Sequence, residues 1–258
     1  MDLYRLIPGT TRLLVSIPHA GTYVPPAIAG RMTEGARALP DTDWHVDRVY
    51  DFLAEIGATV LIATHSRYVV DLNRPPDDAA LYPGLAGSGL CPVETFDGEP
   101  IWQPRHAPAK AEIAERVAHY WQPYHACLRA ELGELRARHG KAVLWDAHSI
   151  RSRVPRLFSG DLPVLNFGTN DGRSCDPGLA ARLLGYTLGL QDCTAVLDGR
   201  FKGGYITRAY GDPASGINAV QLELAQRSYM DESSLEYLPD TARQIRERLR
   251  ALLEIALE

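Results

Sequence analysis

Two histidines stand just beyond apolar runs, in a setting that suits metal ligands. His19 follows residues 13–17 and a rigid Pro18, and His148 follows another apolar run that includes Asp146. Imidazole is the commonest protein ligand for transition metals, so both side chains are candidate ligands. The alternative for His19 is a hydrogen-bonded turn residue. Because Asp146 and His148 lie two apart on a predicted strand and point the same way, Asp146 is either a partner of the metal site or an acid at the core edge.

Acidic residues crowd the segment that follows the first of these histidines. Asp41, Asp43 and Asp47 lie together with His45 at the expected start of a helix. An aspartate there can cap the free backbone N–H groups of the first turn. Three acids are more than capping requires, so one carboxylate can complete a mixed histidine and carboxylate site.

Glu223 is embedded in the apolar run at residues 219–224. Burying a carboxylate without a partner is costly in free energy. Glu223 therefore either pairs with a cation such as Arg208 or Arg227, or belongs to a functional site at the end of its strand.

Asn73 and Arg74 precede two prolines and form a pair suited to an acidic ligand. A guanidinium binds a carboxylate through two parallel hydrogen bonds, and the asparagine amide can add a third. The alternative is a structural arginine paired with one of the aspartates at positions 71, 77 and 78.

Residues 201–208 place Lys202, Thr207 and Arg208 around two adjacent glycines, which is typical of an anion-binding loop. The segment matches no phosphate-loop pattern, and a glycine-rich surface turn has a similar composition.

The elements that must position these residues alternate between short apolar runs and long amphipathic stretches. The runs predict strands at 13–17, 59–63, 68–71, 142–146, 162–166 and 219–224. Apolar residues spaced by three and four predict helices at 47–56, 110–139, 177–188 and from 239 to the C-terminus, with Pro123 requiring a kink or break in the longest. This alternation favours an α/β fold, a three-layer sandwich around a mostly parallel twisted sheet. Such sheets bind ligands beyond the carboxyl ends of their strands, where the candidate residues lie.

The composition is that of an ordinary globular protein and favours one domain over residues 1–258. Of the 258 residues, 45% are hydrophobic and 23% charged, and the formal net charge of −5 argues against nucleic acid or an anionic membrane as a partner. The N-terminus has no signal-peptide pattern and no long apolar stretch occurs, so a cytoplasmic location is expected. Four widely spaced cysteines are expected to be reduced thiols. The sequence leaves the oligomeric state open.

Six separated segments together resemble the N-formylglutamate amidohydrolases, also called N-formylglutamate deformylases. The resemblance runs nearly end to end, and the segments occur in the same order. They are SIPHAGTYVP (16–25), LPDTDWHVDRVYDF (39–52), YVVDLNRPP (68–76), LWDAHSI (144–150), FKGGYITRAYG (201–211) and VQLELAQRSYM (220–230).

The resemblance implies a zinc-exopeptidase-like (phosphorylase/hydrolase-like) fold and a site that binds Zn²⁺, although other divalent metals are possible. His19 and His148 match the two histidine ligands of the relatives, but Thr22 stands where they carry a glutamate. The acidic ligand is therefore assigned to Asp43, with Asp47 as second choice and Asp146 as a second-choice ligand or a supporting acid.

The resemblance also implies the remaining roles. Glu223 matches the catalytic glutamate base, and Asn73 with Arg74 matches the pair that binds a substrate carboxylate. Lys202, Thr207 or Arg208 is then expected to bind a second carboxylate.

The expected reaction is zinc-dependent hydrolysis of N-formyl-L-glutamate to L-glutamate and formate, the last step of histidine degradation. One alternative is a related zinc amidohydrolase or carboxypeptidase-like enzyme that acts on another N-acyl amino acid. A second alternative is a non-catalytic protein that binds metal or ligand. A serine hydrolase is disfavoured because the sequence has no Gly-x-Ser-x-Gly motif.

Overall fold

A seven-stranded mixed sheet forms the centre of the computed structural model, which describes residues 1–81, 84 and 87–258. The strand order is β1-β3-β2-β4-β7-β5-β6, and the central strands β3, β2, β4 and β7 are parallel. β1 runs antiparallel to β3, and β5 runs antiparallel to β7. The strands are β1 (Tyr4–Ile7), β2 (Leu13–Ile17), β3 (Thr59–Ala63), β4 (Ala142–Ile150), β5 (Leu165–Gly168), β6 (Ala195–Leu197) and β7 (Ile217–Ala225).

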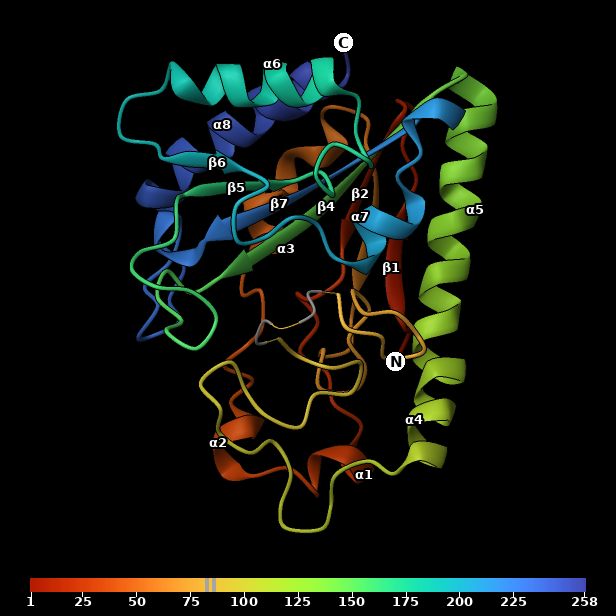
Figure 1. The fold of residues 1–258 in the computed structure, drawn as a ribbon, viewed down its shortest axis with the longest axis vertical. Coiled ribbons are helices and arrows are strands. Elements are labelled where there is room, and N and C mark those ends of the chain that lie inside the picture. The colour runs from red at the N-terminus through yellow and green to blue at the C-terminus, as the bar shows by residue number, and fades with distance from the viewer. Residues whose placement is uncertain (82–83, 85–86) are drawn as a thin grey trace.

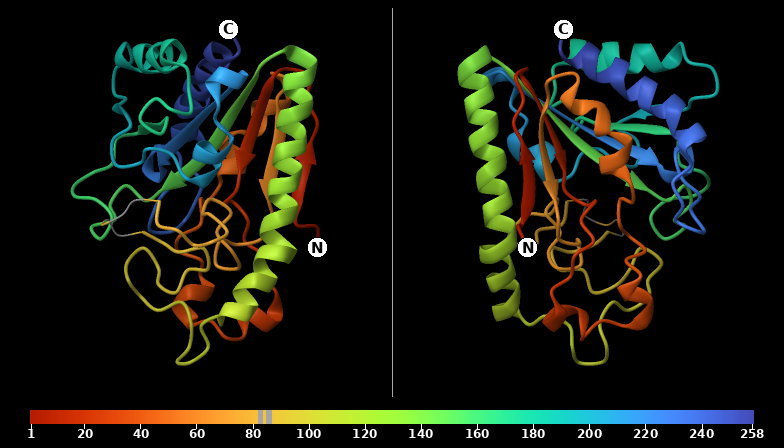
Figure 2. Two further views of the ribbon diagram at one scale, coloured as in Figure 1. Left: turned by 45° about the vertical axis from the view of Figure 1, so that its right-hand side comes forward. Right: turned by 180° about the vertical axis from the view of Figure 1, so that it is seen from behind.

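Helices cover both faces of this sheet and give three layers, as the sequence predicts. α5 packs on one face, while α3, α6 and α8 pack on the other (Figures 1 and 2). Among the described residues, no helix combines the length and the apolar character needed to cross a membrane. The helical segments are α1 (Pro26–Ala29), α2 (Glu34–Arg37), α3 (Val46–Val49), η1 (Asp51–Ala54), α4 (Lys110–Arg116), η2 (Val117–Trp121), α5 (Gln122–His139), α6 (Pro177–Leu188), α7 (Tyr205–Tyr210), η3 (Pro213–Ser215), η4 (Gln226–Ser228) and α8 (Pro239–Ala256).

The irregular region comprises residues 18–45, 64–81, 84 and 87–109 and lies beyond the carboxyl ends of the parallel strands (Figure 1). Its only regular elements, among the residues described, are the short helices α1 and α2. It has an apolar cluster of its own, in which Met32, Tyr68, Ile101 and Trp102 are buried. The irregular region therefore packs as a cap on the sheet edge where ligands bind in this class of fold.

The predicted strand at residues 68–71 is wrong, because this stretch forms turns within the irregular region. Val69 N donates to Ser66 O, and Asp71 N donates to Leu90 O. Val69 and Val70 are buried in two different apolar clusters. A chain buried on both sides has the composition of a buried strand, which explains the error.

The long predicted helix at 110–139 is one helical rod made of α4, η2 and α5. η2 is a π-helical turn that directly precedes Pro123. A proline ring clashes with the carbonyl four residues earlier in an α-helix, and a π turn widens the helix at that place. The chain therefore passes Pro123 without breaking the rod.

Candidate metal and active site

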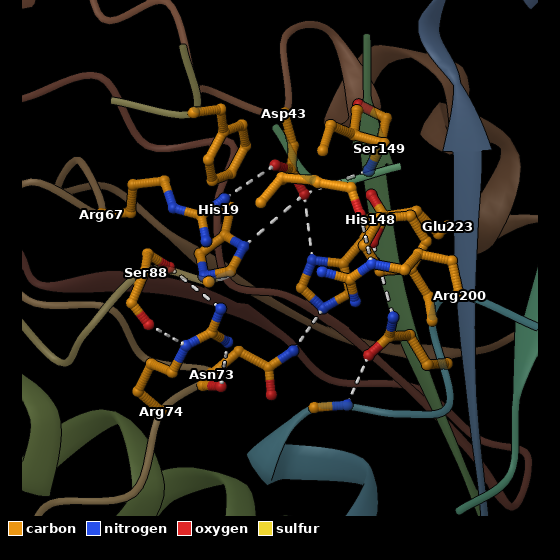
Figure 3. A pocket seen from close by; sticks show the side chains of 17 residues that line it. His19, Asp43, Arg67, Asn73, Arg74, Ser88, His148, Ser149, Arg200 and Glu223 are labelled. Carbon is orange, nitrogen blue, oxygen red and sulfur yellow. Dashed lines mark hydrogen bonds and ion pairs between the residues drawn. The ribbon is translucent and has the colours of Figure 1, made fainter. Parts of the chain in front are cut away.

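The neighbouring parallel strands β4 and β7 place four polar side chains on one face of the sheet, toward the carboxyl ends of the strands. Asp146 pairs with Gln221 in the register of β4 and β7, and His148 pairs with Glu223. Because residues two apart on a strand point the same way, all four face the same side. All four are buried, and the last three line a pocket of about 590 Å³ that is partly open to solvent (Figure 3).

His19, Asp43 and His148 come together at the bottom of this pocket, which also contains Glu223. One ligand atom from each of the three lies within 4.8 Å of the others. Asp43 Oδ2 is 3.0 Å from His148 Nδ1 and 3.7 Å from His19 Nδ1, and it accepts a hydrogen bond from Ser149 N at 3.1 Å. The triad thus joins two residues of the irregular region, His19 just after β2 and Asp43, to His148 within β4.

Each histidine of the triad is backed by a buried carboxylate. His19 Nε2 donates to Asp71 Oδ1 at 2.7 Å, and His148 Nε2 lies 3.1 Å from Asp146 Oδ2. Both rings therefore turn Nδ1 toward Asp43. A carboxylate behind a histidine fixes its orientation and raises its basicity, and metal-ligating histidines almost always have such a partner.

The donor set fits a divalent transition metal. Ligand atoms at about 2.0–2.2 Å from a tetrahedral ion lie roughly 3.3–3.6 Å from one another, and the measured separations of 3.0 and 3.7 Å bracket that spacing. Burial by itself lowers the pKa of His148, but Asp146 and Asp43 outweigh it and hold that pKa well above its usual range. The cationic ring marks a place where positive charge is stabilised, and a metal there would replace the Nδ1 proton.

Asp43 carries the acidic position of this set, and Asp47 does not. Asp43 is buried, whereas the half-exposed carboxylate of Asp47 is hydrogen-bonded to Arg5. Asp146 stands behind His148 rather than beside the other ligand atoms. The structure therefore gives the three acids different positions, with only Asp43 placed among the ligand atoms of the two histidines.

Asn73 lies against the back of the site. Its Nδ2 donates to Asp146 at 3.1 Å and lies 2.8 Å from His148 Nε2, and its Oδ1 accepts from Ile206 N. A Cβ on Gly204 would come within 2.4 Å of the Asn73 amide, so only glycine permits this approach. These contacts make Asn73 a support for His148. Asn73 also lines the pocket, so its expected contact with a substrate stays a prediction.

Three arginines line the pocket (Figure 3). The buried Arg67 donates to Asp71 at 2.6 Å and lies 3.7 Å from Asp43. Arg74 is oriented by Ser88, whose carbonyl and hydroxyl accept at 2.7 and 2.9 Å. Arg200 donates from Nε to Leu157 O at 2.6 Å. The pocket of this acidic protein is therefore locally cationic.

The other predicted anion-binding residues lie elsewhere. Lys202 forms an ion pair with Asp171 at the surface, and Arg208 donates to Gly203 O. Thr207 is buried and contacts Asp146 at 3.4 Å. None of the three is among the residues that line the pocket. Thr207 and Arg208 belong to α7, whereas Lys202 lies in the non-helical segment before it.

Glu223 is 8% exposed and faces the pocket beside His148. Burial raises the pKa of Glu223 to about 8, although the charge of His148 opposes the shift. In the described structure its nearest side-chain partner is Gln221 Nε2 at 3.5 Å. A carboxyl group with a pKa near neutrality is suited to accept and return a proton.

The sequence analysis missed Arg67, Gln221 and Arg200 as pocket residues. Gln221 could have been found, because it lies two positions before Glu223 on the same strand face. Arg200 directly precedes the segment 201–208, whose composition is typical of an anion-binding loop. Arg67 had no local signal, since its position depends on the path of the irregular region.

Known proteins provide an independent comparison. Residues 11–230 match the family described as N-formylglutamate amidohydrolase. An N-formylglutamate deformylase of Pseudomonas aeruginosa is 52% identical over 250 residues, covering 96% of this chain and 94% of the relative. One from Pseudomonas putida is 50% identical over 250 residues, covering 96% and 93%.

Solved structures agree with the fold and with the family. The crystal structure of N-formylglutamate amidohydrolase from Ralstonia eutropha JMP134 has a TM-score of 0.83 at 25% identity and covers 99% of both chains. A gene product of Agrobacterium tumefaciens has a TM-score of 0.74 at 20% identity, covering 100% of this chain and 97% of its own, which supports the fold alone. On the family match and the two close relatives, this chain belongs to the N-formylglutamate amidohydrolase family.

Proposed function

We propose that this protein hydrolyses N-formyl-L-glutamate to L-glutamate and formate at the pocket that contains His19, Asp43, His148 and Glu223. Family membership and two half-identical relatives named N-formylglutamate deformylase support the reaction. The observation that carries the assignment to this pocket is the buried triad beside a glutamate and three arginines.

The proposed metal ligands are His19 Nδ1, a carboxylate oxygen of Asp43 and His148 Nδ1, with Asp71 and Asp146 behind the rings. A divalent metal bound there would supply Lewis acidity, which polarises the formyl oxygen and makes a bound water more acidic. Zinc is our first choice, because a mixed set of two imidazoles and one carboxylate suits it. Cobalt, nickel and manganese accept similar ligands.

Glu223 is the proposed proton carrier. Its carboxylate takes a proton from the attacking water, and the oxygen adds to the formyl carbon. When the C–N bond breaks, Glu223 returns the proton to the leaving nitrogen. The products are formate and the free amino group of glutamate.

Arg67 is placed to compensate the negative charge that develops on the formyl oxygen. Its guanidinium lies in the pocket, beside the triad, where it is 3.7 Å from Asp43. Fixed charges in a water-poor site stabilise such a developing charge more strongly than they would in water.

Arg74 and Arg200 are the proposed partners of the two substrate carboxylates. They lie on opposite sides of the paired histidines in Figure 3. A substrate with two carboxylates accounts for the second arginine, which a monocarboxylate would leave unused. Thus Arg200 takes the role that the sequence analysis gave to Lys202, Thr207 or Arg208.

The finer assignments that accompany this function are proposals as well. They are a zinc-exopeptidase-like relationship of the fold, a place at the end of histidine degradation and a cytoplasmic setting. The alternative substrate is another N-acyl amino acid, and the two arginines favour acidic ones.

The test is formate release from N-formyl-L-glutamate before and after dialysis against a chelator. We expect release by the native protein, loss after chelation and recovery with one equivalent of Zn²⁺ per chain. N-acetyl-L-glutamate, N-formyl-L-aspartate and N-formyl-L-glutamine serve as comparison substrates. Full activity after complete metal removal would refute the metal-dependent mechanism, and faster hydrolysis of the acetyl compound would refute the formyl preference.

A further inference from the structure

Residues 68–74 carry three groups of the site but have no strand partner. Asp71 backs His19, Asn73 contacts His148, and Arg74 lines the pocket. A buried backbone outside a sheet still needs hydrogen-bond partners for its carbonyl groups, because leaving them unsatisfied costs free energy. The position of these side chains therefore depends on what binds the carbonyls of this segment.

Side chains from the helical rod of α4, η2 and α5 bind those carbonyls. Arg116 Nη1 donates to Val69 O at 2.9 Å, and Trp121 Nε1 donates to Arg74 O at 3.0 Å. His125 Nε2 contacts Leu72 O at 2.8 Å. All three side chains are buried, with exposed fractions of 2%, 6% and 1%. The rod thus replaces the sheet neighbour that this segment lacks.

The hydrogen bonds of Trp121 and His125 fall on the two carbonyls that flank Asn73. His125 binds the carbonyl of Leu72, the residue before Asn73, and Trp121 binds the carbonyl of Arg74, the residue after Asn73. The two rings also stack on each other, with centroids 3.7 Å apart and planes inclined by 24°. One rigid pair of rings therefore fixes the backbone that presents both Asn73 and Arg74.

His125 also joins this segment to α7. Burial lowers the pKa of His125 to about 3, so the ring is neutral at ordinary pH. Leu72 O can only accept, so Nε2 carries the proton and Nδ1 accepts from the Tyr210 hydroxyl at 2.9 Å. α7 in turn donates Ile206 N to Asn73 Oδ1. Asn73 is consequently held from the rod and from α7 together.

The π turn η2 explains how Arg116 and Trp121 reach the same segment. Five residues of α-helix advance about 500°, which would leave the two side chains about 140° apart. A π turn takes up one additional residue, and this removes about 100° of that offset. Trp121 and His125 are then four apart in regular α-helix and share a face. The widened turn thus aligns the donors along one side of the rod.

We infer that Trp121 and His125 are positioning residues that set the place of Arg74 and Asn73 for substrate binding. The inference rests on the proposed function, in which Arg74 binds a substrate carboxylate. Neither ring is among the residues lining the pocket, so both act through the backbone of residues 72–74.

The test compares Trp121→Phe, His125→Leu and His125→Gln with the native protein at saturating Zn²⁺. Trp121→Phe removes one N–H group and keeps a stacked ring. His125→Leu removes both hydrogen bonds, whereas the Gln side chain retains an N–H₂ group that can reach Leu72 O. Leu135→Ala is the matched control, because Leu135 is buried on the same rod and in the same apolar cluster as Trp121 but further along α5.

We expect Trp121→Phe and His125→Leu to raise KM for N-formyl-L-glutamate about 3- to 10-fold, with kcat changed less than twofold. This range corresponds to the loss of one net hydrogen bond. His125→Gln should recover most of the loss. Leu135→Ala should lower the melting temperature and leave KM unchanged. Calorimetric affinity for the product L-glutamate should weaken in parallel with the rise in KM.

The inference is overturned if Trp121→Phe and His125→Leu lower the melting temperature as Leu135→Ala does while KM and glutamate affinity stay within twofold of the native values. If His125→Leu does not fold, Trp121→Phe and His125→Gln decide the question. Native protein that binds L-glutamate but releases no formate would refute the proposed function alone, and the binding series would still test the positioning role. Native protein that neither binds glutamate nor releases formate would overturn both.

Discussion

Asp71 and Asp146 each orient one histidine of the triad, but they belong to different kinds of structure. Asp71 accepts a hydrogen bond from His19 Nε2, and Asp146 Oδ2 lies 3.1 Å from His148 Nε2, so that Nδ1 of each ring faces Asp43. Asp146 lies inside β4, which has a parallel neighbour on each side. Asp71 lies in the irregular region and is held by Arg67 and by the backbone N–H of Asn73. One half of the site is positioned by a backbone ladder and the other by a network of side chains.

The difference matters for how each half tolerates change. A strand residue keeps its place when its side chain is altered, because the ladder bonds involve only the backbone. A residue held by side chains loses its place when any member of the network is lost. Substitutions in the two halves should therefore differ in their effects on metal binding, catalysis and stability.

Removing either histidine should abolish metal binding, whichever half it belongs to. His148→Ala and His19→Ala should each lose stoichiometric metal and reduce kcat/KM by a factor on the order of 10³ or more, since metal catalysis supplies several kcal/mol. Elemental analysis of metal per chain with parallel formate assays checks this. Full metal content in either variant would exclude that residue as a ligand.

Glu223→Gln should separate catalysis from the structural part of the site. The amide cannot take the water proton, so kcat should fall by about 10²- to 10⁴-fold. Metal content and KM should stay close to native, because β7 holds the side chain in place. Steady-state kinetics with metal analysis measure both, and unchanged turnover would remove Glu223 from the base role.

Asp71→Asn and Asp146→Asn compare the two halves directly. Each should weaken metal affinity by about 10- to 100-fold, the usual effect of losing a carboxylate behind a ligating histidine. Asp71→Asn should also lower the free energy of unfolding, because the buried Arg67 loses its 2.6 Å partner and keeps only the weaker contact with Asp43 at 3.7 Å. Chelator competition and denaturant unfolding test the pair. Equal stability losses would contradict the contrast between ladder and side-chain support.

Arg74→Met and Arg200→Met should differ in substrate preference. Each should raise KM for N-formyl-L-glutamate roughly 10- to 100-fold, as expected for a lost hydrogen bond to a charged group. One variant should weaken N-formyl-L-glutamine equally, because it has lost the partner of the shared carboxylate. The other should spare that compound. Identical ratios in both variants would mean that the arginines do not divide the two carboxylates.

The remaining expected effect is a change in the pH dependence of stability. Burial lowers the pKa of His125 to about 3, with Arg129 adding to the shift and Tyr210 and Tyr205 facing the ring. Between about pH 6.5 and pH 3 the unfolded chain binds a proton at His125 that the folded chain excludes. The free energy of unfolding therefore carries no cost from His125 above pH 6.5, and below that pH it falls by about 1.4 kcal/mol per pH unit. His125→Gln should reduce that slope by one proton in urea unfolding at a series of pH values, and an unchanged slope would contradict the neutral buried ring.

The strand-borne half of the site was largely predictable from sequence, for a physical reason. His148, Asp146 and Glu223 follow from polar residues in apolar strands, where a period of two fixes which side chains share a face. His19 follows from its place at a strand end. Asp43 was ranked above Asp47 only through family resemblance, because the difference between them is burial, which no local pattern reports.

The irregular half was predictable only in part. Arg74 was identified from its chemistry, but Arg67 and the supporting role of Asn73 depend on the path of a segment that reads as a strand. The missed strands β1 and β6 are short and partly exposed at the sheet edges, so their apolar signal is weak. Lys202 and Arg208 were identified from composition, but Lys202 forms an ion pair with Asp171 and Arg208 donates to Gly203 O.

The strand order also constrains the sequence of events during synthesis. β7 is the last strand in the chain, yet it lies between β4 and β5 and carries Glu223. In a nascent chain that ends before residue 217, β4 lacks its neighbour on one side. The pair of β5 and β6 lacks the strand that connects it to the rest of the sheet. Open strand edges invite pairing with other chains. The pocket is therefore completed, and the open edge of β4 covered, only when one late segment inserts into the middle of the fold.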